Sequence, residues 1–367
     1  MKRFMIALAV LLAACAAPAE ETTTDGMTVY TIGWLGPLTG DGATYGLPLQ
    51  RVTEKAVADL NEQWAAKNMK LEIIYEDGAC AGRPALTAAQ KLVNVDGVRI
   101  IHGGGCSGET LGIAPFTEAN EVLLFSSLSS SPDVTNAGDY VFRNYPSDTA
   151  QVGALVSFIQ EQGYSSVALL SENTDYAQAL RRSYNEQLPA VGVEIVADEV
   201  VDPEARDVRA QMTKIADSEA DAVLMLPQTV PMGGVFVKQY KESGIEAQLL
   251  GSEVFIMNDA LNAYPDEMEG VYAPELATPE DEDFKAMQAA TECEIGFYCG
   301  TMYDGVFIIA HLLEQCGEDT ACMKDTLNAL EDWEGRYSGA TTFDENGDVS
   351  GEFFIHQVQD GAKVAVE

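Results

Sequence analysis

The chain has 367 residues, of which 47% are hydrophobic and 22% charged, a composition typical of a globular protein with sizeable cores. It carries 58 acidic against 21 basic residues, a formal net charge of −37 at pH 7. Such a charge repels nucleic acids, phosphates and anionic lipid surfaces, which are therefore excluded as partners.

The N-terminus has the pattern of an export signal. Met1-Lys2-Arg3 precede an apolar run that ends at Ala14, and this run is too short to span a bilayer. We expect residues 1–14 to be a signal peptide and residues 15–27 a lipid-anchored or flexible tether. Leu12-Ala13-Ala14-Cys15 resembles a lipobox, in which Cys15 is lipidated, whereas cleavage after Ala17-Pro18-Ala19 would discard Cys15. Both alternatives predict an exported protein, at the periplasm or cell surface. We expect it to be a lipoprotein that contacts the membrane only through its lipid anchor.

From residue 28 the pattern alternates short apolar strands with helical stretches. In the first part of the chain we expect strands at 29–36, 71–77, 98–104 and 121–127, and helices at 43–66, 84–95 and from near Glu109. This alternation predicts a parallel sheet with helices on both faces.

The same alternation restarts after residue 148. The predicted helices are 149–162, 176–190, 207–217 and 233–243, and the predicted strands are 166–171, 193–201, 222–227, 248–252 and 270–275. Helices at 279–290, 301–315 and 321–331, a turn at 344–348 and a last strand are too few for a third domain.

The fold class is therefore α/β, with two doubly wound parallel-sheet lobes joined by a three-segment hinge. We expect one lobe to comprise residues 28–147 plus 277–342 and the other residues 148–276 plus 343–367. Crossings near 146, 276 and 342 would form the hinge, and a ligand would bind in the cleft at the carboxyl ends of the strands.

Residues 102–110, HGGGCSGET, could be part of a phosphate-binding loop, an esterase active site or a cysteine nucleophile site. A phosphate-binding loop needs a lysine where Glu109 stands. An esterase needs a G-x-S-x-G elbow, which the sequence lacks, and a triad histidine, whereas His311 and His356 lie in apolar segments. A cysteine nucleophile needs a free thiol, and Cys106 has a prospective disulfide partner. We therefore expect no catalysis, no cofactor and no metal ion.

A small-anion site fits this loop better. Ser107 and Gly108 open a helix, whose free N–H groups together with a hydroxyl can bind an anion, although Ser107 could equally cap its helix. A second hydroxyl-rich loop, SSLSSS at 126–131, follows the next strand. The two loops could hold a carboxylate without any arginine or lysine.

Setting Cys15 aside leaves six cysteines, which allow 15 disulfide connectivities in an oxidising compartment. The two C-x5-C spacings favour the local pairs Cys293–Cys299 and Cys316–Cys322, which leaves Cys80 with Cys106. A zinc site is the competing interpretation of the last four cysteines, although their spacing is wider than usual.

With these features in place, the sequence resembles the branched-chain amino-acid type of periplasmic substrate-binding protein, the receptor of an ABC importer. The resemblance covers most of residues 28–358 and is carried by the order of several motifs: IGWLGPLTGDGATYG (32–46), IYEDGACAGRPALTAAQKLV (74–93), LLFSSLSSSPDVT (123–135), LLSENTDYAQAL (169–180), LLGSE (249–253), TMYDGVFIIAHLL (301–313) and FDENGDVSGEFFIHQV (343–358).

The resemblance implies a type I periplasmic binding protein fold and a set of ligand-binding residues. Ser107, Ser129 and Ser130 would bind the α-carboxylate of an amino acid, and Glu253 would bind its ammonium group. Tyr45 and Tyr176 would contact the ligand, and the family's disulfide matches Cys80–Cys106.

One departure concerns the side-chain pocket. Gln228-Thr229 stand where relatives often have an aromatic residue, so Gln228 is a candidate ligand-binding residue, and a polar, larger or non-α-amino ligand is possible instead of leucine. We expect a monomeric binding protein that delivers a small amino-acid-like ligand to an ABC permease. The alternative is a sensor of an amide, urea or small carboxylate that docks on a membrane receptor.

Overall fold

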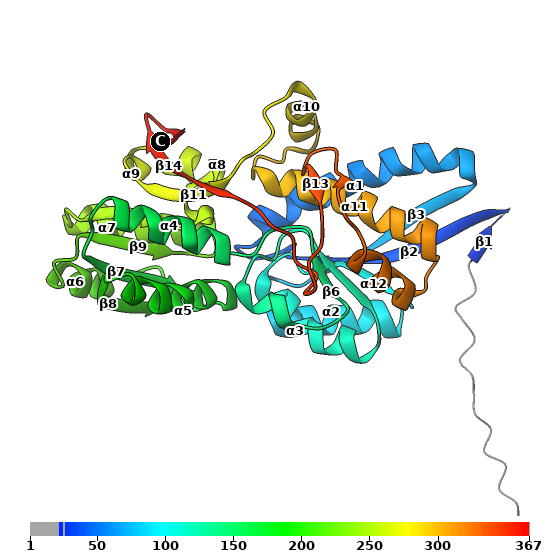
Figure 1. Ribbon diagram of the computed structural model, residues 1–367, viewed down its shortest axis with the longest axis horizontal. Coiled ribbons are helices and arrows are strands. Elements are labelled where there is room, and N and C mark those ends of the chain that lie inside the picture. The colour runs from blue at the N-terminus through cyan, green and yellow to red at the C-terminus, as the bar shows by residue number, and fades with distance from the viewer. Residues whose placement is uncertain (1–21, 25, 367) are drawn as a thin grey trace, which may run out of the picture.

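The structure is a computed structural model that describes residues 22–24 and 26–366. Two α/β lobes lie side by side along its long axis (Figure 1). The predicted signal peptide and Cys15 lie outside the described residues. Within the described part of the chain, no helix combines the length and apolar character that a membrane span requires.

The sheet of the first lobe has the strand order β3-β2-β4-β5-β6, and β1 also pairs with β2. The strands are β1 (Thr22–Thr24), β2 (Met27–Gly36), β3 (Met69–Asp77), β4 (Ile100–Gly103), β5 (Leu123–Ser126) and β6 (Val141–Arg143). All of these pairs are parallel except β1 with β2. Strands β4, β5 and β6 are wholly buried, as expected for a parallel sheet that is covered on both faces.

Helices cover both faces of this sheet. They are α1 (Ala43–Trp64), α2 (Gly82–Asn94) and α3 (Ser107–Ala119), with the short helices η1 (Ala65–Lys67) and η2 (Pro132–Asn136). On α1 the side chains of Leu49, Val52, Ala56 and Leu60 are buried at helical spacing and form part of the core.

The second lobe has a seven-stranded sheet in the order β15-β14-β11-β10-β9-β7-β8. Its strands are β7 (Ser166–Glu172), β8 (Glu194–Val201), β9 (Ala222–Leu226), β10 (Gln248–Gly251), β11 (Tyr272–Leu276), β14 (Phe353–Gln359) and β15 (Ala362–Ala365). The strands from β8 to β11 pair in parallel, and β14 and β15 are antiparallel. Its helices are α4 (Thr149–Glu161), α5 (Asp175–Ala190), α6 (Arg209–Asp217), α7 (Val230–Ser243), η3 (Glu253–Ile256), α8 (Asn258–Ala263) and α9 (Pro265–Met268).

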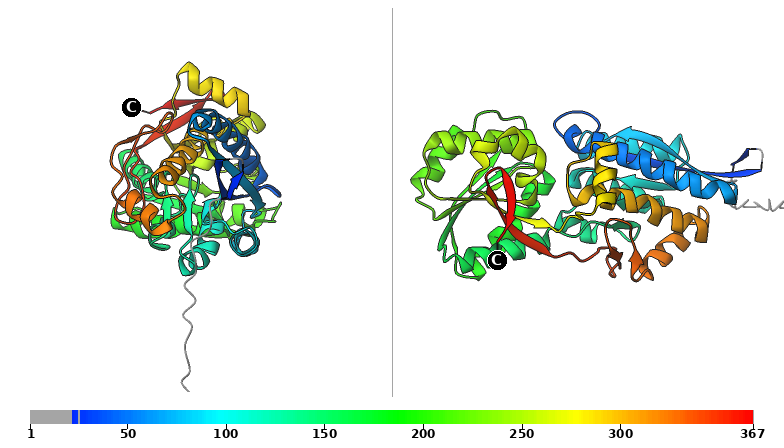
Figure 2. Two further views of the ribbon diagram at one scale, coloured as in Figure 1. Left: turned by 90° about the vertical axis from the view of Figure 1, so that its right-hand side faces the viewer. Right: turned by 90° about the horizontal axis from the view of Figure 1, so that it is seen from above.

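The C-terminal part of the chain serves both lobes. Helices α10 (Glu282–Thr291) and α11 (Phe297–Cys316) pack against α1, and α12 (Thr320–Asn328) packs against α11. A small hairpin of β12 (Trp333–Glu334) and β13 (Ala340–Thr341) follows before β14 joins the second sheet. Three segments therefore connect the lobes, between β6 and α4, between β11 and α10, and between β13 and β14 (Figure 2). The predicted fold class is confirmed.

The six cysteines form the predicted pairs Cys80–Cys106, Cys293–Cys299 and Cys316–Cys322. The last two pairs each bridge six positions of sequence, so their sulfurs are not available as zinc ligands.

Candidate functional site

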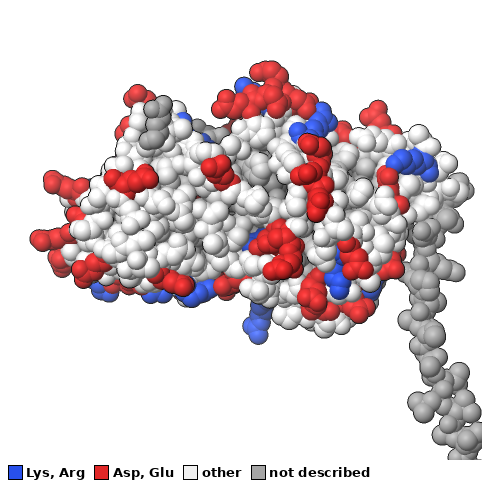
Figure 3. All heavy atoms as spheres, viewed as in Figure 1, with Lys and Arg blue, Asp and Glu red and all other residues white. Residues whose placement is uncertain are grey.

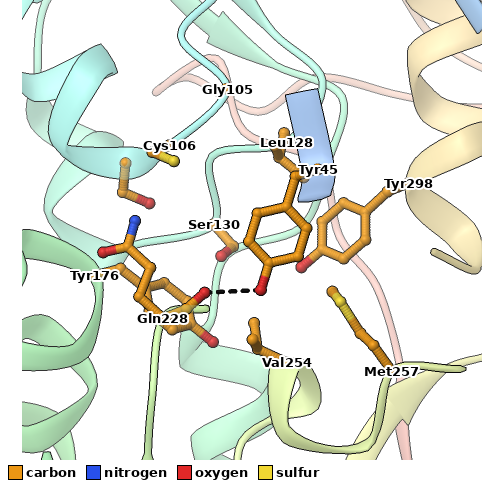
Figure 4. Close-up of a pocket in the computed structure, with 11 residues that line it drawn as sticks. Tyr45, Gly105, Cys106, Leu128, Ser130, Tyr176, Gln228, Val254, Met257 and Tyr298 are labelled. Atoms are coloured by element: carbon orange, nitrogen blue, oxygen red, sulfur yellow. Dashed lines mark hydrogen bonds between the residues drawn. The ribbon is translucent and has the colours of Figure 1, made fainter. Parts of the chain in front are cut away.

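A small cavity, with an accessible volume of about 40 Å³, lies between the two lobes. Its lining comes from loops and helix ends of both lobes (Figure 4): Tyr45, Gly105, Cys106, Ser107, Leu128, Ser130, Tyr176, Gln228, Val254, Met257 and Tyr298. Five predicted ligand-binding residues are in this set, namely Tyr45, Ser107, Ser130, Tyr176 and Gln228. The structure therefore brings them together, although they lie far apart in the sequence.

On the first-lobe side, the loop after β4 presents Ser107 as the first residue of α3. The carboxylate of Glu109 holds this loop, because it accepts hydrogen bonds from the backbone N–H of Cys80 at 2.8 Å and of Cys106 at 2.9 Å. Gly103 has φ +155° and a Cβ there would lie 2.1 Å from the carbonyl oxygen of Leu35, so glycine is required. At the position where a phosphate-binding loop has a lysine, this chain has Glu109, which stabilises the conformation of the binding loop.

The loop after β5 contributes Ser130 to the cavity but not Ser129. The Ser129 hydroxyl lies 2.7 Å from the Thr110 hydroxyl and donates to the carbonyl oxygen of Gly104 at 3.0 Å. It therefore faces the protein interior and stabilises the neighbouring loop. Ser129 is not among the residues that line the cavity, and its predicted role in binding a carboxylate stays a prediction.

On the second-lobe side, Tyr176 is the second residue of α5, and its buried hydroxyl has no hydrogen-bond partner among the described residues. Gln228 follows β9 and contacts the first lobe. Its carbonyl oxygen accepts a hydrogen bond from the Tyr45 hydroxyl at 2.8 Å, and its Nε2 donates to Sγ of Cys80 at 2.9 Å. These contacts join the two lobes across the cleft, so the structure is a closed form.

Glu253 is not among the residues that line the cavity, and its predicted role in binding an ammonium group stays a prediction. It begins η3, is 5% exposed, and its Oε1 accepts a hydrogen bond from the Tyr145 hydroxyl. Its Oε2 is buried and has no hydrogen-bond partner among the described residues. The next residue, Val254, is the one that faces the cavity. Burial raises the pKa of the Glu253 carboxyl to about 8, and nearby Asp148 and Glu275 add to this effect.

Sequence reasoning missed the apolar lining residues, which are Leu128, Val254, Met257 and Tyr298. Nothing in the sequence distinguishes them from ordinary core residues. Only the position of Leu128 inside the SSLSSS loop could have indicated it.

The lining contains no lysine, arginine or histidine. The buried Arg143 is occupied elsewhere, since its Nε donates to Oδ1 of Asp348 at 2.7 Å and its Nη1 to the carbonyl oxygen of Ser131 at 2.8 Å. His102 and Ser127 lie 2.8 Å apart, but neither lines the cavity, and burial lowers the pKa of His102 to about 3. The site can therefore bind an anionic group only through neutral donors.

Comparison with known proteins identifies the family. The family model described as "Periplasmic binding protein" matches residues 29–363. The chain belongs to the periplasmic binding protein family. A member from Pseudomonas aeruginosa, the leucine-, isoleucine-, valine-, threonine- and alanine-binding protein, is 25% identical over 359 residues, covering 95% of each chain. The predicted resemblance to the branched-chain amino-acid type is thus confirmed.

Solved structures of periplasmic binding proteins have the same fold. The substrate-binding protein of a Streptococcus pneumoniae branched-chain amino acid transporter, in complex with isoleucine, aligns with a TM-score of 0.80 at 24% identity, over 92% of this chain and 99% of that one. A Rhodopseudomonas palustris solute-binding protein in complex with benzoate aligns with a TM-score of 0.82 at 14% identity, over 92% and 95%. One fold thus holds ligands of different chemistry in these relatives.

Proposed function

We propose that this protein is an extracytoplasmic solute-binding protein that captures a small amino acid between its lobes and delivers it to the permease of an ABC importer. One observation carries the proposal. The cavity has a helix N-terminus with the Ser107 hydroxyl on one side, and Glu253 with an unpartnered oxygen lies behind the opposite wall. A zwitterion needs both an anion site and a cation site, and here each comes from a different lobe.

The nature of the lining supports an amino acid of modest size. A carboxylate can be bound by the Ser107 and Ser130 hydroxyls and the free N–H groups of α3, which favour a negative charge. The accessible volume of the cavity is about 40 Å³, well below the ~300–1,000 Å³ usual for ligand pockets, so the closed cleft has room only for a small ligand. Leu128, Val254 and Met257 would contact an aliphatic side chain.

An aromatic carboxylate is the second candidate ligand, because three tyrosines line the cavity and one structural relative is described as a benzoate complex. Its weakness is Glu253, since a ligand without an amino group leaves the second carboxylate oxygen buried and unpaired. An unsatisfied buried polar group of this kind costs about 1–3 kcal/mol.

A thermal-shift screen of the mature protein tests the proposal. Proteinogenic amino acids, benzoate, 4-hydroxybenzoate, acetamide and urea are compared, since a ligand at 100 times its Kd stabilises the folded state by about 2.7 kcal/mol. We expect one or more small aliphatic amino acids to raise the melting temperature and benzoates to leave it unchanged. Stabilisation by benzoates alone would overturn the amino-acid assignment.

The cellular setting is part of the same proposal. Membership in the periplasmic binding protein family supports export, and we propose that Cys15 carries a lipid anchor, that the protein acts as a monomer, and that the lobes divide at the predicted boundaries. Cys15→Ser should abolish lipid labelling and release the protein in soluble form. A mature wild-type protein that begins at Glu20 would refute the anchor.

A further inference from the structure

Tyr145 lies in the first segment that connects the lobes and touches the cavity wall from behind. Its side chain is fully buried, and its ring stacks on that of Tyr298, with ring centroids 4.2 Å apart and planes inclined by 10°. Tyr298 lines the cavity (Figure 4), whereas Tyr145 does not. Tyr145 can therefore affect a ligand only through its neighbours.

The neighbour that matters most is Glu253. The Tyr145 hydroxyl donates a hydrogen bond to Oε1 of Glu253, and the Glu253 backbone N–H donates to Oε1 of Gln151 at 3.2 Å. The backbone and one carboxylate oxygen of Glu253 are thereby fixed. The other oxygen, Oε2, is buried without a hydrogen-bond partner among the described residues, and the next residue, Val254, lines the cavity, so this free acceptor lies directly behind the cavity wall.

We propose that Tyr145 is a positioning residue for ligand binding, because its hydrogen bond to Oε1 of Glu253 presents Oε2 to the ammonium group of the ligand and favours the ionised carboxylate. This inference rests on the proposed function, in which the ligand is an amino acid. The amino group of the ligand would replace the missing partner of Oε2.

The charges around Glu253 make this hydrogen bond important. The titratable groups that face it are acids and tyrosines from several elements: Asp148, Glu275, Tyr45, Tyr145, Tyr176 and Tyr298. One of these acids, Glu275, forms an ion pair with Lys363. Burial, the largest effect, and then Asp148 and Glu275 raise the pKa of the Glu253 carboxyl to about 8, although the Tyr145 hydroxyl and, to a smaller extent, the Tyr298 hydroxyl lower it.

The consequence is a pH-dependent affinity. An ammonium group binds the carboxylate, not the protonated acid, so below about pH 8 ligand binding must displace a proton from Glu253. Affinity should therefore fall as the pH falls. Without the Tyr145 hydroxyl the carboxylate is less stable, so the loss of affinity should begin at a higher pH.

The test is Tyr145→Phe, which keeps the ring that stacks on Tyr298 and removes only the hydroxyl. The matched control is Tyr184→Phe, since the Tyr184 hydroxyl is equally buried and has no hydrogen-bond partner among the described residues. Calorimetric titrations with L-alanine and L-leucine between about pH 5.5 and 9 give the affinity and the protons released.

A hydrogen bond to a charged group is worth about 1.5 kcal/mol or more, and one pH unit corresponds to about 1.4 kcal/mol. Tyr145→Phe should thus weaken binding about tenfold at pH 7 and move the pH profile upward by about one unit, whereas Tyr184→Phe should change neither. In a Glu253→Gln background, Tyr145→Phe should have no further effect on affinity, which separates positioning from a general packing defect.

The outcomes distinguish the two proposals. If the wild type binds an amino acid and Tyr145→Phe shows the same pH profile as the wild type, the positioning assignment is overturned and the proposed function stays intact. An equal loss of affinity in the Glu253→Gln background would also overturn it. A wild-type protein that binds neither of these amino acids nor any other in the screen would refute both.

Discussion

Removing the Cys80–Cys106 disulfide should lower both the stability and the ligand affinity. Cys80 lies in the turn between β3 and α2, and Cys106 directly precedes Ser107, the first residue of α3. The bond therefore ties the binding loop to the edge of the neighbouring βα unit. The perturbation is the double variant Cys80→Ala/Cys106→Ala, which leaves no free thiol.

The magnitude follows from the length of the closed loop. The cysteines are separated by 26 positions, so the chain-entropy model predicts a loss of about 3.5 kcal/mol of unfolding free energy. Unfolding a chain of this length has an entropy of about 0.7 kcal/mol per kelvin, so the melting temperature should fall by about 5 °C. Because Glu109 still holds the backbone of both positions, Ser107 should be loosened only partly, and we expect affinity to fall about fivefold, about 1 kcal/mol.

The control is Cys316→Ala/Cys322→Ala, which removes a bond between α11 and α12 that bridges six positions and is far from the cavity lining. Its shorter loop predicts a loss of about 2.4 kcal/mol and about 3 °C, with unchanged affinity. Scanning calorimetry and isothermal titration measure both quantities. The reasoning fails if the Cys80–Cys106 variant melts no lower than the control, or binds ligand as tightly as the wild type.

Three further predictions concern the cleft. Ser107→Ala should weaken an amino-acid ligand at least tenfold, because a hydrogen bond to a charged carboxylate is worth about 1.5–3 kcal/mol; equal affinities in calorimetry would remove Ser107 from the site. Tyr45→Phe removes the hydrogen bond between the lobes, worth about 1 kcal/mol, and should enrich the open form about fivefold; an unchanged radius of gyration in solution scattering without ligand would contradict this. Burial raises the folded-state pKa of Glu109 and Glu172 to about 7 and that of Glu253 to about 8, whereas glutamates in the unfolded chain titrate near pH 4.3. Between about pH 4.5 and 8 the folded state therefore binds more protons than the unfolded state, so the melting temperature of the ligand-free protein should fall as the pH rises. Glu253→Gln should make this fall less steep, whereas a melting temperature that rises with pH would show that burial does not control these groups.

The sequence predicted most helices and strands because buried parallel strands are continuous apolar runs bounded by helical periodicity. The strand expected at 71–77 is β3 (Met69–Asp77), and the helix expected at 43–66 is α1 (Ala43–Trp64). The elements missed are short. Strand β6 has three residues and helix α9 has four, which is too few for a period to appear.

The candidate site was predictable where its chemistry is local. Ser107 and Ser130 each follow the carboxyl end of a parallel strand. Ligands of α/β folds bind at that end of the sheet, so the position of both serines follows from the fold class. Ser129 precedes Ser130 by one residue, and only the conformation of the loop decides which hydroxyl faces the cavity. The contact between Tyr145 and Glu253 joins residues 108 positions apart, and no pattern in the sequence relates them.

The acidity of the protein and the neutral lining of the cavity together bear on the choice of ligand. Asp and Glu far outnumber Lys and Arg over the face seen in Figure 3, in keeping with a formal net charge of −37. A field of this sign slows the approach of an anion such as benzoate and acts much less on a zwitterion, whose net charge is zero. Among the described lining residues there is no basic side chain to balance the charge of a bound carboxylate, which the hydroxyls and the N-terminus of α3 would have to hold. In the proposed complex, an ammonium group on the ligand would balance this charge and would also supply the missing partner of Glu253. The long-range field and the local chemistry of the cleft therefore favour the same class of ligand, an amino acid with an uncharged side chain.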